Sequence, residues 1–370
     1  MKSLSGAMAP ALRPLASLLI ALGVMLGLTT QPLGVGRAEI ARAATPALVG
    51  FSFSPRTAAW LGEDPAPALE TLLRELTPDL VRLPVYWDSV EARPGVFDFR
   101  ETDRMLSIIT AYNRTHVSRP ARVILVAGLR NMGYPELYVP AWIPAAERDP
   151  ASKMDVDPRY QGYLAATVIH YRSSPILHSW QIENEPLDNV PTTAGTEVDI
   201  DGDHLQDEIE KVKEIDSRHP IVITTYNSAT LSLDMAAMSP GGASSSGPRP
   251  AGHPLGALQL GDVLGLDLYV VTGDTSLTDA SAHKRIDWKS RALVYWAGQA
   301  TAQNKPIWVT EMQGAPWPGQ DDFKPADLLY SANAYRRHGA SVILLWGVES
   351  WLGSDTWMQA GRQARAVLSS

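Results

Sequence analysis

Short and nearly continuous apolar runs recur along the chain, and each of them ends in polar or aromatic residues. Continuous runs of Val, Ile and Leu are typical of strands that are covered on both faces, as in parallel sheets. We therefore predict eight strands. They are LVGFSFSP (48–55), LVRLPVYW (80–87), RVILVAGLR (122–130), ILHSWQIENEP (176–186), IVITTYNS (221–228), DVLGLDLYV (262–270), PIWVTEMQG (306–314) and SVILLWGVESW (341–351).

The segments between these runs have helical spacing. In 66–76, apolar residues at 69, 72, 73 and 76 form one stripe with a period near 3.6. Similar patterns predict helices over 101–114, 160–172, 203–215 and 324–339. Strands that alternate with helices favour the α/β class, as a single closed (β/α)8 TIM barrel rather than an open doubly wound sheet. The glycine-rich phosphate loop of a nucleotide-binding fold does not follow the first strand.

Two stretches are irregular. Residues 239–256 are rich in Gly, Ser and Pro and predict a mobile loop before the sixth strand. Residues 187–203 predict a long acidic loop after the fourth strand. No second domain can be delimited, so the prediction is one catalytic domain over residues 44–370.

The N-terminal segment, residues 1–43, differs from the rest of the chain. Lys2 and Arg13 precede the apolar run 15–28, and Ala41-Arg42-Ala43 offers small residues in an A-x-A arrangement. This layout is typical of a secretory signal, and the run is short of the ~20 residues that a spanning helix needs. We expect a secreted or cell-surface protein. An uncleaved signal that attaches the protein to a membrane is the alternative.

Composition excludes several classes of protein. The chain has no Cys, so it has no disulfide framework. Its net charge is −8, and removal of residues 1–43 takes away four basic residues and one acidic residue, which gives −11. An acidic protein repels phosphate backbones, so we expect no nucleic-acid partner. Eleven Trp beside five Phe is a skewed aromatic ratio. Trp is a flat platform for sugar rings, although most of these residues are expected to pack in the core.

Candidate chemistry lies where the strands end, because a barrel active site collects residues from the C-terminal ends of its strands. Two glutamates close apolar runs: Glu185 follows the fourth strand and Glu311 the seventh. The other polar or aromatic residues at strand ends are Arg82, Tyr86, Trp87, Arg130, Asn131, Asn184, Tyr226, Asn227, Asp267, Tyr269, Gln313, Trp346, Glu349 and Trp351.

Strands four and seven of an eight-stranded barrel face each other across its mouth. Two carboxylates placed there suit cleavage of a glycosidic bond: one acid protonates the leaving oxygen while the other attacks the sugar carbon. At a separation of ~5–5.5 Å no water fits on the far face, and configuration is retained. We predict Glu185 as the acid/base and Glu311 as the nucleophile. The alternative is that each is an ordinary carboxylate in a strand-end loop.

The sequence resembles the retaining glycoside hydrolases of the (β/α)8-barrel clan A, the cellulase and β-galactosidase-like superfamily. The resemblance rests on IENEP at the end of strand four, VTE at the end of strand seven and VRLPVYWDSVEARPGVFDF at strand two. It implies that Glu185 is the acid/base and Glu311 the nucleophile, and that Arg82 contacts the nucleophile. The individual family is unresolved, because Pro186 follows the acid where the β-galactosidases have an aromatic residue. The cellulase-like family has a His at the place of Asp267.

The resemblance also implies that Tyr269 lies near the nucleophile and that Trp346 forms the floor of a sugar subsite. We expect Asn184 to hold a sugar hydroxyl, and Trp87, Asn227 and Trp317 to support or bind substrate. Trp317 could equally well be a packing residue, and Arg82 could be a salt-bridge partner only. Glu183 is expected on the same strand face as Glu185, one pleat deeper, as a buried structural carboxylate paired with a cation.

Metal and cofactor sites find little support. The segment DIDGDHLQDE (199–208) superficially suggests calcium, but its Gly is misplaced for an EF-hand loop, and an acidic loop that caps the next helix is favoured. The eight His are scattered without zinc-site spacing. We expect no metal and no cofactor.

The leading hypothesis is an exported retaining β-glycosidase that acts on an oligo- or polysaccharide. A non-catalytic carbohydrate-binding barrel is one alternative. A transglycosylase that uses the same two glutamates is another.

Overall fold

The computed structural model describes residues 46–133, 136–148, 154–188, 190–191, 197–198, 200–226, 253–270, 282–316 and 323–370. These belong to one compact unit, Ala43–Ser370. Asn227, Trp317 and the N-terminal segment lie outside the described residues, as does most of 239–256. Among the described helices, none combines the length and the hydropathy required to cross a membrane.

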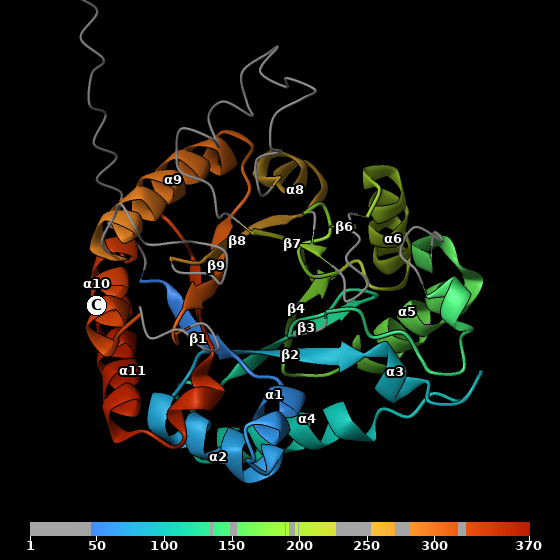
Figure 1. Cartoon of the computed structure of the whole chain (residues 1–370), viewed down its shortest axis with the longest axis horizontal. Helices are drawn as coiled ribbons and strands as arrows, with labels where there is room; N and C mark the ends of the chain where they lie inside the picture. Colours follow the sequence, from blue (N-terminus) through green and yellow to red (C-terminus); the bar gives the residue numbers. More distant parts are fainter. Residues whose placement is uncertain are drawn as a thin grey trace, which may run out of the picture. The chain divides into compact units, whose positions relative to one another are not determined.

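Eight parallel strands close into a barrel in the order β1-β10-β9-β8-β7-β4-β3-β2 (Figure 1). Every strand therefore pairs with its predecessor and successor among the barrel strands, and the first pairs with the last. This confirms the predicted (β/α)8 barrel. The strands are β1 (Leu48–Ser52), β2 (Leu80–Tyr86), β3 (Arg122–Gly128), β4 (Leu177–Ile182), β7 (Ile221–Tyr226), β8 (Val263–Leu268), β9 (Ile307–Gln313) and β10 (Val342–Trp346).

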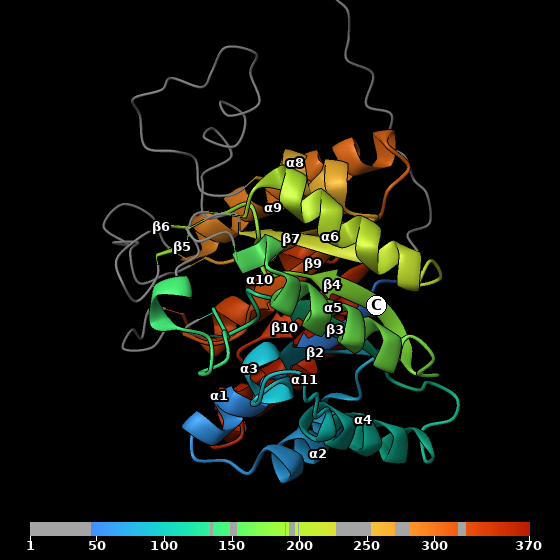
Figure 2. The ribbon, with the colours of Figure 1, turned by 90° about the vertical axis from the view of Figure 1, so that its right-hand side faces the viewer.

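Helices surround the barrel (Figure 1), and α5 and α6 lie side by side against it (Figure 2). A short antiparallel pair, β5 (Val190–Pro191) with β6 (Glu197–Val198), lies in the loop after β4. The helices are α1 (Pro55–Trp60), α2 (Pro65–Leu76), α3 (Trp87–Val90), α4 (Arg100–Asn113), α5 (Pro158–Tyr171), α6 (Gly202–Ile215), α8 (Pro254–Leu260), α9 (Ala282–Ala302), α10 (Pro325–Tyr335) and α11 (Asp355–Leu368), with 3-10 turns η1 (Ala145–Glu147), η3 (Met154–Val156) and η4 (Val348–Trp351).

The predicted helices form close to their expected bounds. In α2 the whole leucine stripe is buried, Pro65 occupies the first turn, and the Asp64 carboxylate caps the helix by accepting the Ala66 N–H at 3.1 Å. Asp201 caps α6 in the same way at 2.8 Å. Residues 200–208 therefore include the cap and the first turns of α6, as expected for this segment. The apolar spacing in the sequence did not predict α9 and α11, and α8 begins inside the predicted loop 239–256.

The barrel has two apolar layers. The larger cluster lies between the strands and the helices. A smaller one fills the barrel interior with residues that alternate along the strands with those of the larger cluster. Its buried members are Leu80, Ile124, Val222, Val263, Trp308, Val342 and Leu344. Further along the strands the inward positions are polar, namely Arg82, Gln181, Thr224, Asp267 and Thr310. This change from apolar to polar marks the end of the barrel where the candidate site lies.

Candidate active site

The two predicted glutamates meet at the C-terminal end of the barrel. Glu311 lies in β9, and Glu185 follows β4 directly. One carboxylate oxygen each from Glu185, Glu311 and Asp267 lie within 4.8 Å of one another. An oxygen–oxygen distance within 4.8 Å fits the close class of carboxylate pairs, ~5–5.5 Å apart, better than the wide class of ~6.5–9.5 Å that leaves room for a water.

Arg82 holds Glu311 from inside the barrel. Its Nη1 lies 2.5 Å from Oε1 of Glu311, and both side chains are buried. The remaining donors of the guanidinium are also bonded: Nε donates to Gln181 Oε1 at 2.7 Å, and Nη2 donates to Asn184 Oδ1 at 2.7 Å. Arg82 is thus a salt-bridge partner and a positioning group at once, because the planar fork fixes the direction of the Glu311 carboxylate.

Tyr269 donates a hydrogen bond to the other oxygen of Glu311, Oε2. Burial, and next to it the charge of Glu311, raise the pKa of Tyr269 well above its ordinary value. The phenol therefore remains a donor over the whole working range of pH. With Arg82 on one oxygen and Tyr269 on the other, the Glu311 carboxylate is held in one orientation.

Glu185 has the opposite environment. It is buried, and no cation forms a salt bridge with it among the described residues. Burial above all raises the pKa of Glu185 well above its ordinary value. A carboxyl group in this setting stays protonated near neutral pH and is suited to donate its proton.

The backbone around Glu185 is strained. Glu185 has φ 46° and Glu183 has φ 62°, in the left-handed region that non-glycine residues seldom adopt. The Glu185 N–H is held by Thr224 Oγ1 at 2.9 Å, which pins the turn to β7. The regular strand ends at Ile182, and this sharp turn at Glu183-Asn184-Glu185 brings the Glu185 carboxylate to the mouth of the barrel.

The same turn makes the expectation for Glu183 wrong in two respects. Glu183 and Glu185 do not share a strand face, because β4 ends at Ile182, before either residue. Its partners are the backbone N–H groups of Leu129 and Arg130, at 2.7 and 2.6 Å, and the Tyr160 hydroxyl on α5, in place of the expected salt bridge to a cation. Burial raises the pKa of Glu183 to about 7. Glu183 is therefore a structural carboxyl between β3 and α5, apart from the glutamate pair.

Asn184 contacts the same network. Its Oδ1 accepts from Arg82 at 2.7 Å and from Gln181 Nε2 at 3.1 Å. Its Nδ2 has no hydrogen-bond partner among the described residues, although the side chain is only 4 % exposed. The amide group is therefore oriented through its oxygen, and its nitrogen is left to donate to a ligand.

The two tryptophans expected at the site have different environments. Trp346, at the end of β10, is half-buried, and its ring lies 6.0 Å from the guanidinium carbon of Arg82. Trp87 is completely buried, donates its indole N–H to Glu91 at 2.8 Å and packs against Tyr160 and Tyr163. It leaves no face for a sugar. The structure therefore assigns Trp87 to the core and not to the substrate-binding surface.

Two polar residues of the site, Gln181 and Thr224, had not been selected from the sequence, and they bond to Asn184 and Glu185. Asp267, selected only as a residue at a strand end, lies beside both glutamates. The sequence signal that could have identified Gln181 and Thr224 is a polar residue within an otherwise apolar strand. Glu349, in η4, is also buried and accepts the Ser54 N–H at 2.6 Å, and burial raises its pKa to about 7.

The three carboxylates are also the group of described side chains best placed to hold a metal ion. Arg82 argues against it, because its positive charge already occupies Oε1 of Glu311 and would repel a cation beside it. Two donors on Glu311 and a protonated Glu185 suit acid and nucleophile chemistry better than metal ligation.

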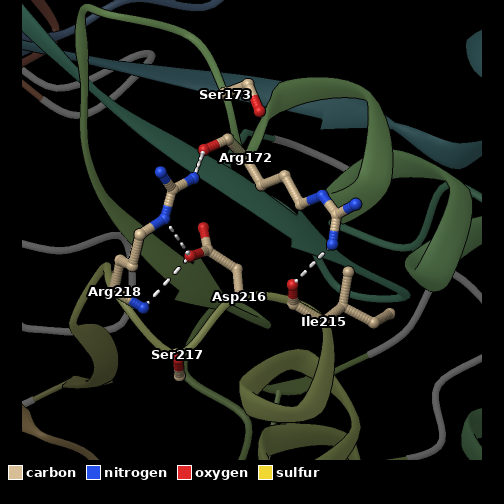
Figure 3. A pocket seen from close by; sticks show the side chains of 6 residues that line it. All are labelled: Arg172, Ser173, Ile215, Asp216, Ser217 and Arg218. Atoms are coloured by element: carbon tan, nitrogen blue, oxygen red, sulfur yellow. Dashed lines mark hydrogen bonds and ion pairs between the residues drawn. The ribbon is translucent and has the colours of Figure 1, made fainter.

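A pocket elsewhere on the protein has a different character. It has a volume of about 300 Å³ and is lined by Arg172, Ser173 and the segment 215–218 (Figure 3). These residues precede β4 and β7, so the pocket lies at the N-terminal end of the barrel, opposite the glutamates. Arg172 Nη1 donates to the Ile215 carbonyl at 2.9 Å, which joins the two loops. We interpret these contacts as structural, as is usual for this end of the fold.

Comparison with known proteins supports the fold. No family model matches the chain, and no curated protein matches it. Among solved structures, GH5_18 from Streptomyces cattleya, in complex with GlcNAc, is similar with a TM-score of 0.61 at 15% identity, over 88% of this chain and 80% of that one. GH5_18 from Bifidobacterium longum subsp. infantis has a TM-score of 0.61 at 12% identity, over 88% and 79%. The cold-adapted β-galactosidase from Rahnella sp. R3 has a TM-score of 0.56 at 12% identity, over 89% of this chain and 56% of that one. At these identities the likeness concerns the fold alone, the (β/α)8 barrel expected from the sequence.

Proposed function

We propose that this protein is an exported retaining β-glycosidase, with Glu185 as acid/base and Glu311 as nucleophile. The observation that carries the proposal is the pairing of two buried glutamates, with carboxylate oxygens within 4.8 Å, in opposite environments. Glu311 has a hydrogen-bond donor on each of its two oxygens, whereas burial raises the pKa of Glu185 well above its ordinary value. A carboxyl group with a raised pKa beside a second carboxylate that is held by two donors is the arrangement that acid and nucleophile chemistry requires.

The reaction then takes two steps. In the first, an oxygen of Glu311 attacks the anomeric carbon, the bond to the leaving oxygen breaks, and Glu185 gives its proton to that oxygen. In the second, Glu185, now ionised, takes a proton from water, and this water displaces Glu311 from the sugar. Asn184 Nδ2 is placed to donate to a sugar hydroxyl, and Trp346 to stack on the ring.

The first test is hydrolysis of a panel of aryl β-glycosides and oligosaccharides by the chain without residues 1–43. The panel includes β-mannosides, Manβ1-4GlcNAc and β-galactosides, because similar structures are described as a complex with Manβ1-4GlcNAc, an exo-β-1,4-mannosidase and β-galactosidases. We expect one sugar to be released with retained configuration. Glu311→Gly should abolish the reaction, and azide should restore it with formation of the α-glycosyl azide.

The alternatives predict other products. A carbohydrate-binding barrel binds a glycan from the panel and hydrolyses none, which would overturn the enzymatic proposal. A transglycosylase consumes the same donor but forms a longer oligosaccharide when an acceptor sugar is added. Export is tested separately: the N-terminal residue of protein recovered outside the cytoplasm should lie near position 44, whereas an intact N-terminus would indicate an uncleaved anchor.

A further inference from the structure

The carboxyl group of Asp267 is bonded on one side only. Asp267 lies in β8 and is the register partner of Glu311 in β9. It is fully buried. Its Oδ1 accepts a hydrogen bond from Thr310 Oγ1 at 2.6 Å, whereas its Oδ2 has no hydrogen-bond partner among the described residues. The neighbours within 4.8 Å are the carboxylate oxygens of Glu185 and Glu311, which are acceptors.

This hydrogen-bonding pattern fits a protonated carboxylic acid and not an ionised carboxylate. An ionised carboxylate needs donors on both oxygens, and a buried oxygen without a donor is costly. A carboxylic acid needs an acceptor for its O–H, and one oxygen of each glutamate lies within 4.8 Å of an oxygen of the Asp267 carboxyl. The titratable groups that act on Asp267 include Arg82 on β2, Glu311 on β9 and Asp188 after β4, together with Glu185 after β4 and Tyr269 after β8. Arg82 is already bonded to Glu311. Burial, and next to it the charge of Glu311, accordingly raise the pKa of Asp267 well above its ordinary value.

We propose that Asp267 is a positioning residue that stays protonated at neutral pH and donates a hydrogen bond from Oδ2 to whichever of the two glutamates is ionised. This inference rests on the proposed function. In the first chemical step the proton of Glu185 leaves with the departing oxygen, while Glu311 becomes a neutral ester. The total charge of the three carboxyl groups is unchanged, but the negative charge has moved from Glu311 to Glu185.

Asp267 adjoins both positions of that charge. Its O–H donates to Glu311 before the step and to Glu185 after it, with a rotation of the side chain and without loss of its own proton. A donor that follows the charge stabilises both the free enzyme and the glycosyl-enzyme. Arg82 does not do this, because its donors are bonded to Glu311, Gln181 and Asn184.

The protonation state is measured directly by carbon NMR of the chain without residues 1–43, labelled at the aspartate carboxyl carbon. The Asp267 signal is assigned by its loss in Asp267→Asn. The reference is Asp216, a buried aspartate whose pKa lies below its ordinary value although burial raises it, because Trp180 and His219 bond to it. We expect Asp216 to remain ionised from pH 5 to 7 and Asp267 to remain protonated. Ionisation of Asp267 within or below this range would overturn the proposal.

The functional consequence is measured with Asp267→Leu, which has no donor, and Asp267→Asn, whose amide both donates and accepts. Loss of one donor to a reacting charge costs ~10²–10³-fold in kcat. We expect a loss of that order for Asp267→Leu and a recovery of ~10-fold or more with Asp267→Asn. Equal loss in both variants contradicts a donor role.

If Asp267→Leu does not fold, the pH dependence of kcat/KM in Asp267→Asn decides. An ionised Asp267 would raise the pKa of Glu185, so its replacement would shift the alkaline limb to lower pH. A protonated Asp267 predicts that the limb stays in place. If the wild type cleaves no glycoside, the proposed function fails, whereas the carboxyl titration still shows whether Asp267 holds its proton.

Discussion

Nη1 of Arg82 in β2 lies 2.5 Å from Oε1 of Glu311 in β9, although 229 residues separate them in the sequence. Both side chains are inside the barrel, and Arg82 is completely buried. The pair joins opposite parts of the closed sheet and fixes the carboxylate proposed to attack the sugar. Removal of either partner leaves an uncompensated buried charge, which is strongly destabilising.

Arg82→Met should therefore impair both activity and stability. We expect kcat to fall by ~10²–10³, because the nucleophile loses a donor, and the free energy of unfolding to fall by about 3–5 kcal/mol. Steady-state kinetics and urea unfolding measure the two effects. Arg114→Met, at an exposed arginine after α4, is the control and should change neither. A fully stable and fully active Arg82→Met would contradict the role of the pair.

The pH dependence of kcat/KM should have an alkaline limb set by Glu185. The raised pKa of Glu185 means that the protonated, active form persists above pH 4.5 and that activity falls as the pH rises through the raised value. In Glu185→Ala, an activated aryl glycoside whose leaving group needs no proton should still react, and its rate should lose this limb. An unchanged limb in Glu185→Ala would assign it to another group.

The two tryptophans offer a paired test of site against core. Trp346→Ala should reduce kcat/KM, chiefly through a higher KM, and leave the unfolding transition close to that of the wild type, because this side chain is half-buried. Trp87→Ala should lower the free energy of unfolding by about 3–5 kcal/mol, because it empties a site that is 0% exposed. Thermal unfolding and glycosidase kinetics on both variants provide the comparison. The reverse pattern would return Trp87 to the substrate-binding surface.

Glu349 should make the protein less stable as the pH rises from acid to neutral. Burial raises its pKa in the folded protein to about 7 from 4.5. Between these pH values the folded state holds a proton that the unfolded state has released. The contribution of Glu349 to the free energy of unfolding is therefore fully present below pH 4.5 and declines up to pH 7. The decline contributed by this group is about 3 kcal/mol.

Glu349→Gln should remove that part of the pH dependence, as measured by urea unfolding at several pH values between 4.5 and 7. Glu63→Gln, at an exposed surface position, is the control. If both variants keep the slope of the wild type, Glu349 is ionised in the folded protein at neutral pH.

The sequence by itself determined the order of the strands and the residues that end them. Apolar runs of strand length between amphipathic helices bury enough surface in only a few arrangements, and a parallel sheet places all its C-terminal ends together. For this reason Glu185 and Glu311 could be selected before any coordinates were known, whereas the resemblance to a known superfamily singled out Arg82 and Tyr269 among the other strand ends. The helices α9 and α11 were missed because α9 lacks a sharp apolar stripe and α11 follows the last strand, where alternation gives no cue.

Only the tertiary structure decided which side chains meet. The turn at Glu183 and Glu185 breaks the two-residue period, so alternation placed Glu183 on the wrong face. In the sequence, Trp87 and Trp346 both come at the end of an apolar run. In the structure, Trp87 begins α3 and is buried in the core, whereas Trp346 lies at the barrel mouth near Arg82. The approach of Asp267 to both glutamates depends on the register and closure of strands that are remote in sequence. These are long-range properties, because each requires the positions of several strands at once, and no local pattern of residues contains them.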